Sequence, residues 1–331
     1  MVYSRDVASG TQYHIPVMLM EVLNGLDECI RRKDKENKVV VDCTAGGMGH
    51  SSQIAKKLES SVNSKLICID KDIEAINQNQ HRVTEIKADA VFVNDGFENI
   101  KNILNGEKVD VILADLGVSN HQIDTPNRGF SYMKDGDLDM RMDVNQKRDA
   151  YHIVNNYTPE RLYEIIKEFG EEKFAKSISA AIVKARPLKT TLELSKVIQS
   201  AVPGNYFKTG GHPAKRTFQA IRIEVNRELD ILEKFVRDAV ECLKPHGRLM
   251  VITFHSLEDR IVKQTMKELS TECLCPPKSP KCICGHRATV EVITRKPMLP
   301  TDEEMKINPR SISAKLRIAQ KKEEHEYGNI A

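Results

Sequence analysis

The chain has 331 residues, with 50 lysines and arginines against 47 aspartates and glutamates, so its formal charge is +3. Hydrophobic residues make up 40% of the chain and charged residues 29%, which excludes collagen-like, disordered and low-complexity proteins. No stretch approaches the roughly 18 consecutive apolar residues of a membrane-spanning helix, and the first residues lack the apolar segment of a secretory signal. We therefore expect a cytoplasmic protein of about two domains.

Short β-rich runs alternate with helical segments in the first part of the chain. The predicted strands lie at residues 38–43, 65–70, 90–93 and 109–115, and the predicted helices at 51–59 and 73–79. Continuous apolar strands separated by helices indicate a parallel sheet with both faces covered.

The alternation stops after the fourth strand. Residues 120–148 are polar and have no clear period, whereas residues 158–199 are helical only. Pro187 ends one helix of this region, and Thr191 or a neighbour is expected to cap the next.

Strand and helix patterns then return. The later elements are a long helix at 221–243, a strand at 248–254 and β-like runs at 289–294 and 314–318. We therefore predict an α/β sheet domain formed by residues 1–124 and 221–331, interrupted by a helical insertion at 125–220.

Glycines follow the first predicted strand directly. The run Thr44–Ser51 reads TAGGMGHS and lies between that strand and a helix. Glycine lets the backbone approach a ligand closely, and a helix N-terminus offers free N–H groups. Asp70 ends the second strand, where a carboxylate can bind both hydroxyls of a ribose. Together these features favour a nucleotide-type site over a tight turn beside a solvated aspartate.

The charges around this loop distinguish between nucleotide cofactors. A dinucleotide-binding loop reads G-x-G-x-x-G, but Ser52 stands where the last glycine belongs. Asp42 would repel a pyrophosphate and suits the cationic groups of S-adenosylmethionine (SAM) better. The pattern G-x-x-x-x-G-K-[ST] is absent from the sequence, which disfavours an NTPase. The sequence therefore predicts SAM rather than NAD.

Asp115 ends the fourth strand. Because ligands bind outside the carboxyl ends of parallel strands, Asp115 should face the same crevice as Gly47 and Asp70. Chemically specific runs occur along the rest of the chain. With the glycine loop, they are His14–Val17, Asp115–Ser119, Arg128–Ser131, Leu138–Asp143, Gly170–Glu172, His212–Ala214, Arg216–Arg222, Phe254–Lys263, Asn308–Ser311 and Ala314–Arg317. Through these runs the chain resembles, nearly end to end, the RsmH (MraW) family of bacterial 16S ribosomal RNA methyltransferases.

The resemblance implies a Rossmann-like class I SAM methyltransferase with an inserted helical domain that recognises RNA. It implies transfer of a methyl group to the exocyclic N4 of a decoding-centre cytosine in 16S rRNA of the small subunit. It also implies SAM-binding residues, which are Gly47, Met48, Gly49, His50, Asp70, Phe97, Asp115 and Gln122. Phe97 would form an apolar wall for adenine. Asn120 departs from the serine that is common in the family, which affects fine substrate contacts rather than the activity.

The choice of residue for catalysis stays open at this point. The N4 amine of cytosine is a poor nucleophile because its lone pair is delocalised into the ring. Asp115, or a carbonyl of the following loop, could accept a hydrogen bond from the amine and localise that lone pair. Asp115 could equally serve only to bind SAM. Transfer requires neither a metal nor a covalent enzyme intermediate.

Several residues are candidates for contact with RNA. Phe130 and Tyr132, beside Arg128, could stack on an unstacked base or pack within their loop. His255 could face the substrate or serve the structure. The basic residues in and near the insertion could contact phosphates or form a solvated face. They are Lys184, Arg186, Lys189, Lys208, Lys215 and Arg216.

The eight cysteines fall into two groups. Those scattered among apolar runs, predicted to be buried free thiols, are Cys29, Cys43, Cys68 and Cys242. Those clustered as two C-x-C pairs are Cys273, Cys275, Cys282 and Cys284, with His286 nearby. Because zinc sites usually have C-x₂-C pairs, a zinc site, a reduced loop and labile disulfides all stay open.

Two other functions would retain the glycine loop. The chain could be a SAM-dependent amino-methyltransferase of another nucleic acid or a small molecule, or a non-catalytic SAM-binding factor in ribosome assembly. The sequence also leaves open whether naked RNA, the small subunit or a late precursor is the partner, and whether the protein is a monomer or a homodimer.

Overall fold

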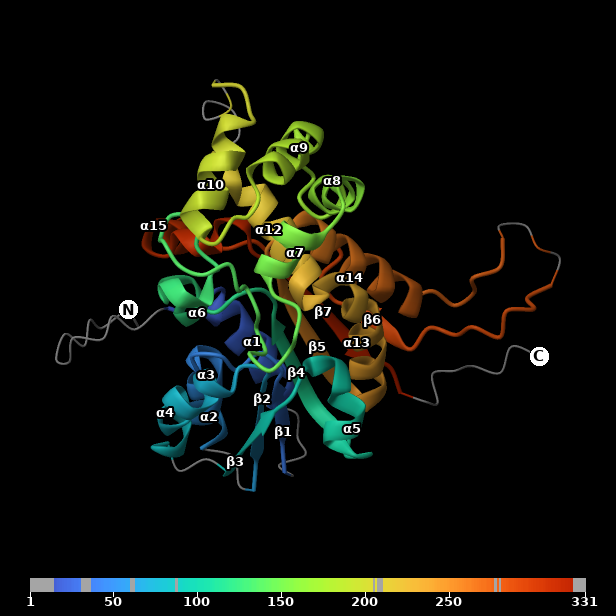
Figure 1. Cartoon of the computed structure of the whole chain (residues 1–331). Helices are drawn as coiled ribbons and strands as arrows, with labels where there is room; N and C mark the ends of the chain where they lie inside the picture. Colours follow the sequence, from blue (N-terminus) through green and yellow to red (C-terminus); the bar gives the residue numbers. More distant parts are fainter. Residues whose placement is uncertain are drawn as a thin grey trace.

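A sheet of seven strands forms the centre of the protein, in the order β3-β2-β1-β4-β5-β7-β6 (Figure 1). The computed structural model describes residues 15–30, 37–59, 63–86, 89–204, 206, 211–276, 279 and 281–323, so His14 and Lys208 lie outside the described residues. The strands are β1 (Val39–Asp42), β2 (Lys65–Asp70), β3 (Asp89–Asn94), β4 (Val109–Asp115), β5 (Leu243–Thr253), β6 (Val290–Val292) and β7 (Lys315–Lys321). Strands β1 to β5 run parallel, β7 is antiparallel to β5, and β6 is antiparallel to β7. The predicted parallel sheet is therefore confirmed, with an antiparallel edge.

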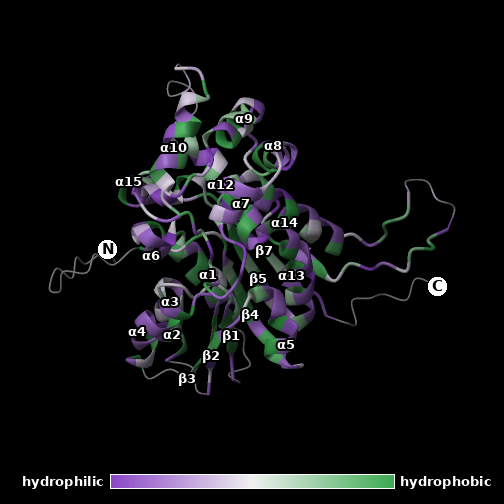
Figure 2. Ribbon diagram, viewed as in Figure 1, coloured by the Kyte–Doolittle hydropathy of each residue, from purple (hydrophilic) through white to green (hydrophobic). Residues whose placement is uncertain are grey.

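Helices cover both faces of the sheet because alternate strand residues point to opposite sides. The helices that pack with Val40 and Leu66 on one face are α1 (Leu19–Ile30), α2 (Gly49–Leu58), α3 (Ile73–Asn79) and α4 (His81–Thr84). The helices that pack with Val41 and Ile67 on the other face are α5 (Ile100–Leu104), α13 (Glu228–Cys242) and α14 (Ser256–Leu269). Figure 2 shows the apolar strands of the sheet enclosed by helices whose outer surfaces are largely hydrophilic.

The middle of the chain forms a helical layer with a core of its own. Its helices are α7 (Ala150–Asn156), α8 (Pro159–Glu168), α9 (Ala175–Ala185), α10 (Thr191–Ser200) and α12 (Ala214–Asn226). Ile153, Ile178 and Phe218 belong to this core, which is distinct from the two cores flanking the sheet. The layer lies beyond the carboxyl ends of the parallel strands (Figure 1).

Short elements complete the structure. They are α6 (Asn120–Asp124), α15 (Asp302–Ile307) and the 3₁₀ turns η1 (Phe97–Asn99), η2 (Pro126–Arg128) and η3 (Pro309–Ser313). No helix within the described ranges combines the length and the apolar character needed to cross a bilayer.

The structure corrects one predicted helix and identifies the residue that caps another. The single helix predicted at 221–243 is wrong, because the chain forms α12 and α13, which meet at Arg227. Arg227 has a left-handed backbone with φ +54°, which ends α12 and redirects the chain. The cap predicted for α10 is provided by Thr190, whose hydroxyl accepts from the N–H of Glu193.

Candidate functional site

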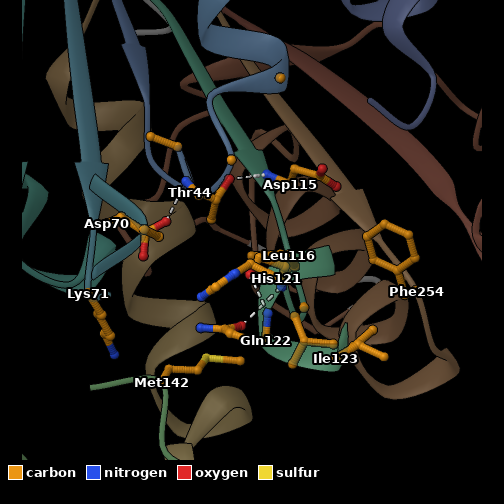
Figure 3. A pocket seen from close by; sticks show the side chains of 18 of the residues that line it. Thr44, Asp70, Lys71, Asp115, Leu116, His121, Gln122, Ile123, Met142 and Phe254 are labelled. Atoms are coloured by element: carbon orange, nitrogen blue, oxygen red, sulfur yellow. Dashed lines mark hydrogen bonds between the residues drawn. The ribbon is translucent and has the colours of Figure 1, made fainter. Parts of the chain in front are cut away.

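The carboxyl ends of the parallel strands open into one cavity of about 860 Å³ (Figure 3). This volume falls within the range of sites for small molecules and cofactors. Asp70 at the end of β2 and Asp115 at the end of β4 line it, as do Gly47 and Gly49 of the loop after β1. The structure thus brings the predicted strand-end residues together, as the geometry of a parallel sheet requires.

Asp70 organises the glycine loop through backbone hydrogen bonds. The N–H of Gly46 donates to Oδ2 over 2.6 Å, and the N–H of Asp72 donates to Oδ1 over 2.8 Å. Gly46 has a positive φ of +43°, which glycine adopts without strain. Burial raises the pKa of Asp70 to about 6, although the two N–H donors act in the opposite direction. Each carboxylate oxygen retains a lone pair for a ligand.

The other predicted residues of the loop are placed differently. Met48 does not line the cavity, because its side chain is fully buried in the core on the α2 face of the sheet. Gly49 lines the cavity, but the reason for glycine there is packing, because a Cβ would lie 2.8 Å from Cγ of Pro16. Asp42 does not line the cavity either. Its buried carboxylate accepts from the hydroxyl of Ser51 over 2.5 Å, which fixes the start of α2.

Asp115 is partly buried and incompletely hydrogen-bonded. Its Oδ1 has no hydrogen-bond partner among the described residues, and its Oδ2 lies 3.6 Å from Nδ1 of His50. Nε2 of His50 must carry a hydrogen, because it lies 2.9 Å from the carbonyl of Val17, which can only accept. Burial raises the pKa of Asp115 to about 7, although the neighbouring His50 lowers it in part. The Asp115 side chain is 23% exposed although Oδ1 is buried, so Oδ2 is the oxygen that a ligand in the cavity can reach.

Phe97 and Gln122, both predicted to bind SAM, line the cavity. The Phe97 ring packs on Phe235 with centroids 4.7 Å apart, and Nζ of Lys71 lies 5.7 Å from its centroid. Gln122 is occupied by internal contacts, because its Nε2 donates to Asp72 over 2.9 Å and its Oε1 accepts from the N–H of Ser119. Gln122 thus closes the N-terminus of α6, a capping box that the sequence analysis did not identify.

A buried ion pair joins the sheet domain to the segment that precedes the helical layer. NH1 of Arg128 donates to Oδ2 of Asp72 over 2.7 Å, and both side chains are buried. NH2 of Arg128 also donates to the carbonyls of Arg141 and Met142. Asp72 in addition caps α3 by accepting from the N–H groups of Glu74 and Ala75. The Arg128 guanidinium therefore serves the structure, in a place that the sequence associated with RNA.

Replacing Asp72 with alanine should lower the free energy of unfolding by about 3–5 kcal/mol, because it leaves the buried Arg128 guanidinium with only the half-exposed Glu74, 3.4 Å away, as a counter-charge. Asp230→Ala is the matched control, since the Arg227–Asp230 pair lies at the surface and should contribute less than about 1 kcal/mol. Denaturant unfolding of the two variants measures the difference. Equal effects of the two substitutions would contradict the role given to the buried pair.

The candidate stacking residues pack against the core of the helical layer, Phe130 buried and Tyr132 partly buried. Phe130 is buried in the core of the helical layer, and the ring of Tyr132 stacks on His212 with centroids 4.6 Å apart. Neither side chain lines the cavity, so the structure favours the packing alternative. Arg186 also has a structural role, because its guanidinium donates to the carbonyls of Val154 and Tyr157 at the end of α7.

His255 lines the cavity and also caps α14. Its Nδ1 accepts from the N–H of Glu258 over 3.5 Å, and its Nε2 lies 3.1 Å from Oε1 of the same residue. Burial alone would raise the pKa of Glu258, but the hydrogen bond and charge of His255, with the charge of Arg222, lower it. His255 therefore has a structural role as the cap of α14, and its ring also borders the cavity.

Sequence reasoning missed several cavity residues that come from distant parts of the chain. Among them are Arg82, Gln219, Arg222, Glu228 and Arg310. Lys215, which the sequence offered either as a phosphate contact or as part of a solvated face, also lines the cavity. Arg82 of α4 donates to the carbonyl of Gly47 and so supports the loop. Arg222 pairs with Glu228 across the break between α12 and α13 over 2.8 Å. In the sequence, the only sign of this pair is that the two opposite charges lie six residues apart. In the continuous helix predicted at 221–243, residues at that spacing would face different sides and would not pair.

Comparison with known proteins identifies the family. The profile of the MraW methylase family matches residues 11–322, which is nearly the whole chain. The chain belongs to the MraW methylase family. Among similar proteins, each named ribosomal RNA small subunit methyltransferase H, that of Finegoldia magna is 47% identical over 93% of this chain and 98% of its own length. Those of Clostridium botulinum and Clostridioides difficile are 50% and 49% identical over 93% of this chain, and 98% and 99% of their own lengths.

Membership of the MraW methylase family confirms the predicted resemblance and the class I SAM methyltransferase fold. Among solved structures, an rRNA methylase from Streptococcus thermophilus aligns with a TM-score of 0.41 and 10% identity, over 91% of this chain and 96% of that chain. That likeness is too distant to support an inference about the site. The cavity at the strand ends is therefore interpreted from its own residues.

Proposed function

We propose that this protein transfers a methyl group from SAM to the exocyclic N4 of a decoding-centre cytosine in 16S rRNA, and that it acts in the cytoplasm. The observation that carries the proposal is the pair of carboxylates, Asp70 and Asp115, at the carboxyl ends of β2 and β4 on either side of β1 in an MraW methylase. The names of the relatives support small-subunit rRNA as the substrate.

The residues of the cavity fit SAM. When bound, SAM supplies an electrophilic methyl group on a positively charged sulfonium. Asp70 would accept from the ribose hydroxyls, and Phe97 would provide an apolar surface for adenine. The loop residues Gly47 and Gly49 would offer backbone contacts, and His50 would act mainly through its neighbour Asp115. Gln122 would contribute by holding α6 in place, and Met48 by packing the loop onto the core.

Asp115 would act on the nucleophile. Its accessible Oδ2 can accept a hydrogen bond from the N4 amine, which localises the nitrogen lone pair and orients it toward the methyl group. This requires the carboxylate form, and a pKa raised to about 7 keeps the proton affinity high enough to take up a proton from the amine during transfer.

We further propose that residues 125–220 form the part that recognises RNA, while residues 1–124 and 221–331 bind SAM. The support is spatial, because Lys215 and Gln219 of α12 line the same cavity as the strand-end carboxylates. A nucleotide that enters between the sheet and the helical layer would therefore contact residues of both parts. The basic residues Lys215 and Arg310 at the cavity are suited to contact phosphates.

Transfer of tritium from labelled SAM to small subunits that lack the modification tests the function. We expect incorporation of label, mapped by nuclease digestion and mass spectrometry to N4 of one decoding-centre cytosine. Naked 16S rRNA and late precursors, assayed in parallel, identify the preferred substrate. Label at another nucleic acid, or SAM binding without transfer, would support the amino-methyltransferase or assembly-factor alternatives instead.

Replacing Lys215 with alanine should weaken RNA binding several-fold and reduce the magnitude of the salt dependence by about one unit of slope. Lys196→Ala is the matched control, because Lys196 is also an exposed lysine of the helical layer but does not line the cavity. Filter binding at several salt concentrations measures both quantities. An unchanged slope for Lys215→Ala would exclude a phosphate contact at this residue.

A further inference from the structure

The segment between α14 and β6 projects from the body of the protein and carries four cysteines (Figure 1). They are Cys273, Cys275, Cys282 and Cys284, all free thiols. None of them lines the cavity at the strand ends. The proposed methyl transfer therefore gives no reason for their presence.

The four sulfur atoms converge on one point. Sγ of Cys273 lies 3.4 Å from that of Cys282 and 3.8 Å from that of Cys284, and the latter two are 3.6 Å apart. Together with Cys275, all four ligand atoms lie within 4.8 Å of one another. A disulfide requires about 2.05 Å between sulfurs, so these distances do not describe disulfides. They do match a tetrahedral site, because bonds of about 2.3 Å to one zinc ion place the sulfurs about 3.8 Å apart.

Backbone N–H groups point at the sulfurs. The N–H of Leu274 donates to Sγ of Cys284, that of Cys275 to Sγ of Cys273, and that of Ile283 to Sγ of Cys275, each over 3.4 Å. Such donors stabilise negative charge on sulfur and orient the ligand, as the surroundings of thiolate metal sites do. The C-x-C spacing allows this, because each middle residue turns its N–H toward a sulfur of the cluster.

The segment has little other means of holding this shape. Its apolar side chains lie in solvent, with Ile283 88% exposed and Leu274 45% exposed, so they form no core. His286 is already used, since its Nε2 lies 3.0 Å from the carbonyl of Glu268 at the end of α14. A short segment without a core requires a cross-link or a metal to keep one conformation.

We propose that Cys273, Cys275, Cys282 and Cys284 bind one structural Zn²⁺ ion as a tetrathiolate site. Four protein ligands leave no open coordination position, so the ion fixes the projecting segment and takes no part in chemistry. Soft thiolate ligands in tetrahedral geometry select zinc over hard cations such as Mg²⁺ or Ca²⁺. The proposal is independent of the methyltransferase function, because the four cysteine ligands lie outside the cavity and zinc content is measured without any assay of methyl transfer.

Metal content of the full-length protein, purified with reductant and without chelator, tests the proposal. Inductively coupled plasma mass spectrometry should find about one zinc per chain, and titration with a mercurial thiol reagent should release it as four thiols react. The double variant Cys282→Ser/Cys284→Ser should retain less than one tenth of the zinc. Cys242→Ala, which removes a buried thiol of the sheet core, should retain it all.

Three outcomes would overturn the proposal. The first is wild-type protein with free thiols that takes up no zinc when ZnCl₂ is supplied. The second is a mass two or four hydrogens lower under non-reducing conditions, which would show disulfides. The third is stoichiometric iron in place of zinc. Because mercurial release uses the wild-type protein, the test does not depend on how the serine variant folds.

Discussion

Replacing Asp115 with asparagine should lower kcat for methyl transfer by about 10²- to 10⁴-fold, the range expected when a positioned acid–base group is lost. The amide keeps the size of the side chain but its oxygen is a weaker acceptor, and it cannot take a proton from the N4 amine. Saturating SAM should not restore the rate. Single-turnover transfer to small subunits measures the chemical step directly.

The pH dependence of the methyl-transfer rate of the wild-type enzyme should reflect the titration of Asp115. Burial raises the pKa of Asp115 to about 7, so its carboxyl group is protonated and inactive as an acceptor below that pH. The rate should therefore rise with pH through about 7 and then level off, whereas the asparagine variant should lack this acidic limb. Asp230→Asn, at an exposed position of α13, should keep the wild-type profile.

Two results would contradict the catalytic role of Asp115. Full turnover at saturating SAM with weakened SAM binding would assign the residue to cofactor binding alone. Full turnover with unchanged SAM binding would leave the acceptor to a carbonyl of the loop that follows β4.

Replacing Asp70 with asparagine should weaken SAM binding by about 100-fold, or roughly 2.7 kcal/mol. The charged acceptor of the ribose contact is lost, and the amide NH₂ must face an N–H group, because both carboxylate oxygens now accept from the backbone of Gly46 and Asp72. Isothermal titration calorimetry with SAM measures the change. Glu74→Gln is the matched control, since Glu74 follows on α3 but does not line the cavity.

SAM affinity should also depend on pH through Asp70. Its pKa is raised to about 6 by burial, so the wild-type protein should lose affinity as the pH falls through that value and the carboxylate is protonated. The asparagine variant should show a flat profile in this range. Unchanged affinity of Asp70→Asn at neutral pH would remove the ribose contact from the proposed site.

The sheet was largely predictable because its signals are local. β2, β4 and α3 have the bounds expected from the sequence, since a buried parallel strand is a short, continuous apolar run bounded by polar residues. The long helix predicted at 221–243 was wrong because nothing in the helical periodicity reveals a left-handed backbone at Arg227. Helices α1 and α14 were not predicted, and their positions follow from packing on the faces of the sheet.

The sequence by itself determined where the candidate site lies. A glycine loop after one strand, with Asp70 and Asp115 at the ends of two others, must meet at one edge because parallel strands share their direction. The cysteine pairs were also visible, although four thiols in sequence do not show whether their sulfurs converge.

Only the tertiary structure decided which side chains face the cavity. Asp42 at the end of β1 and Met48 in the glycine loop lie beside residues that line it, yet both side chains point into the protein, because adjacent residues of a strand or a tight loop can face opposite directions. The contact of His50 with Asp115 joins residues that are distant in the chain, as does the entry of Lys215 into the cavity from α12. Such contacts depend on how layers pack, and packing of distant segments leaves no periodic signal in the sequence.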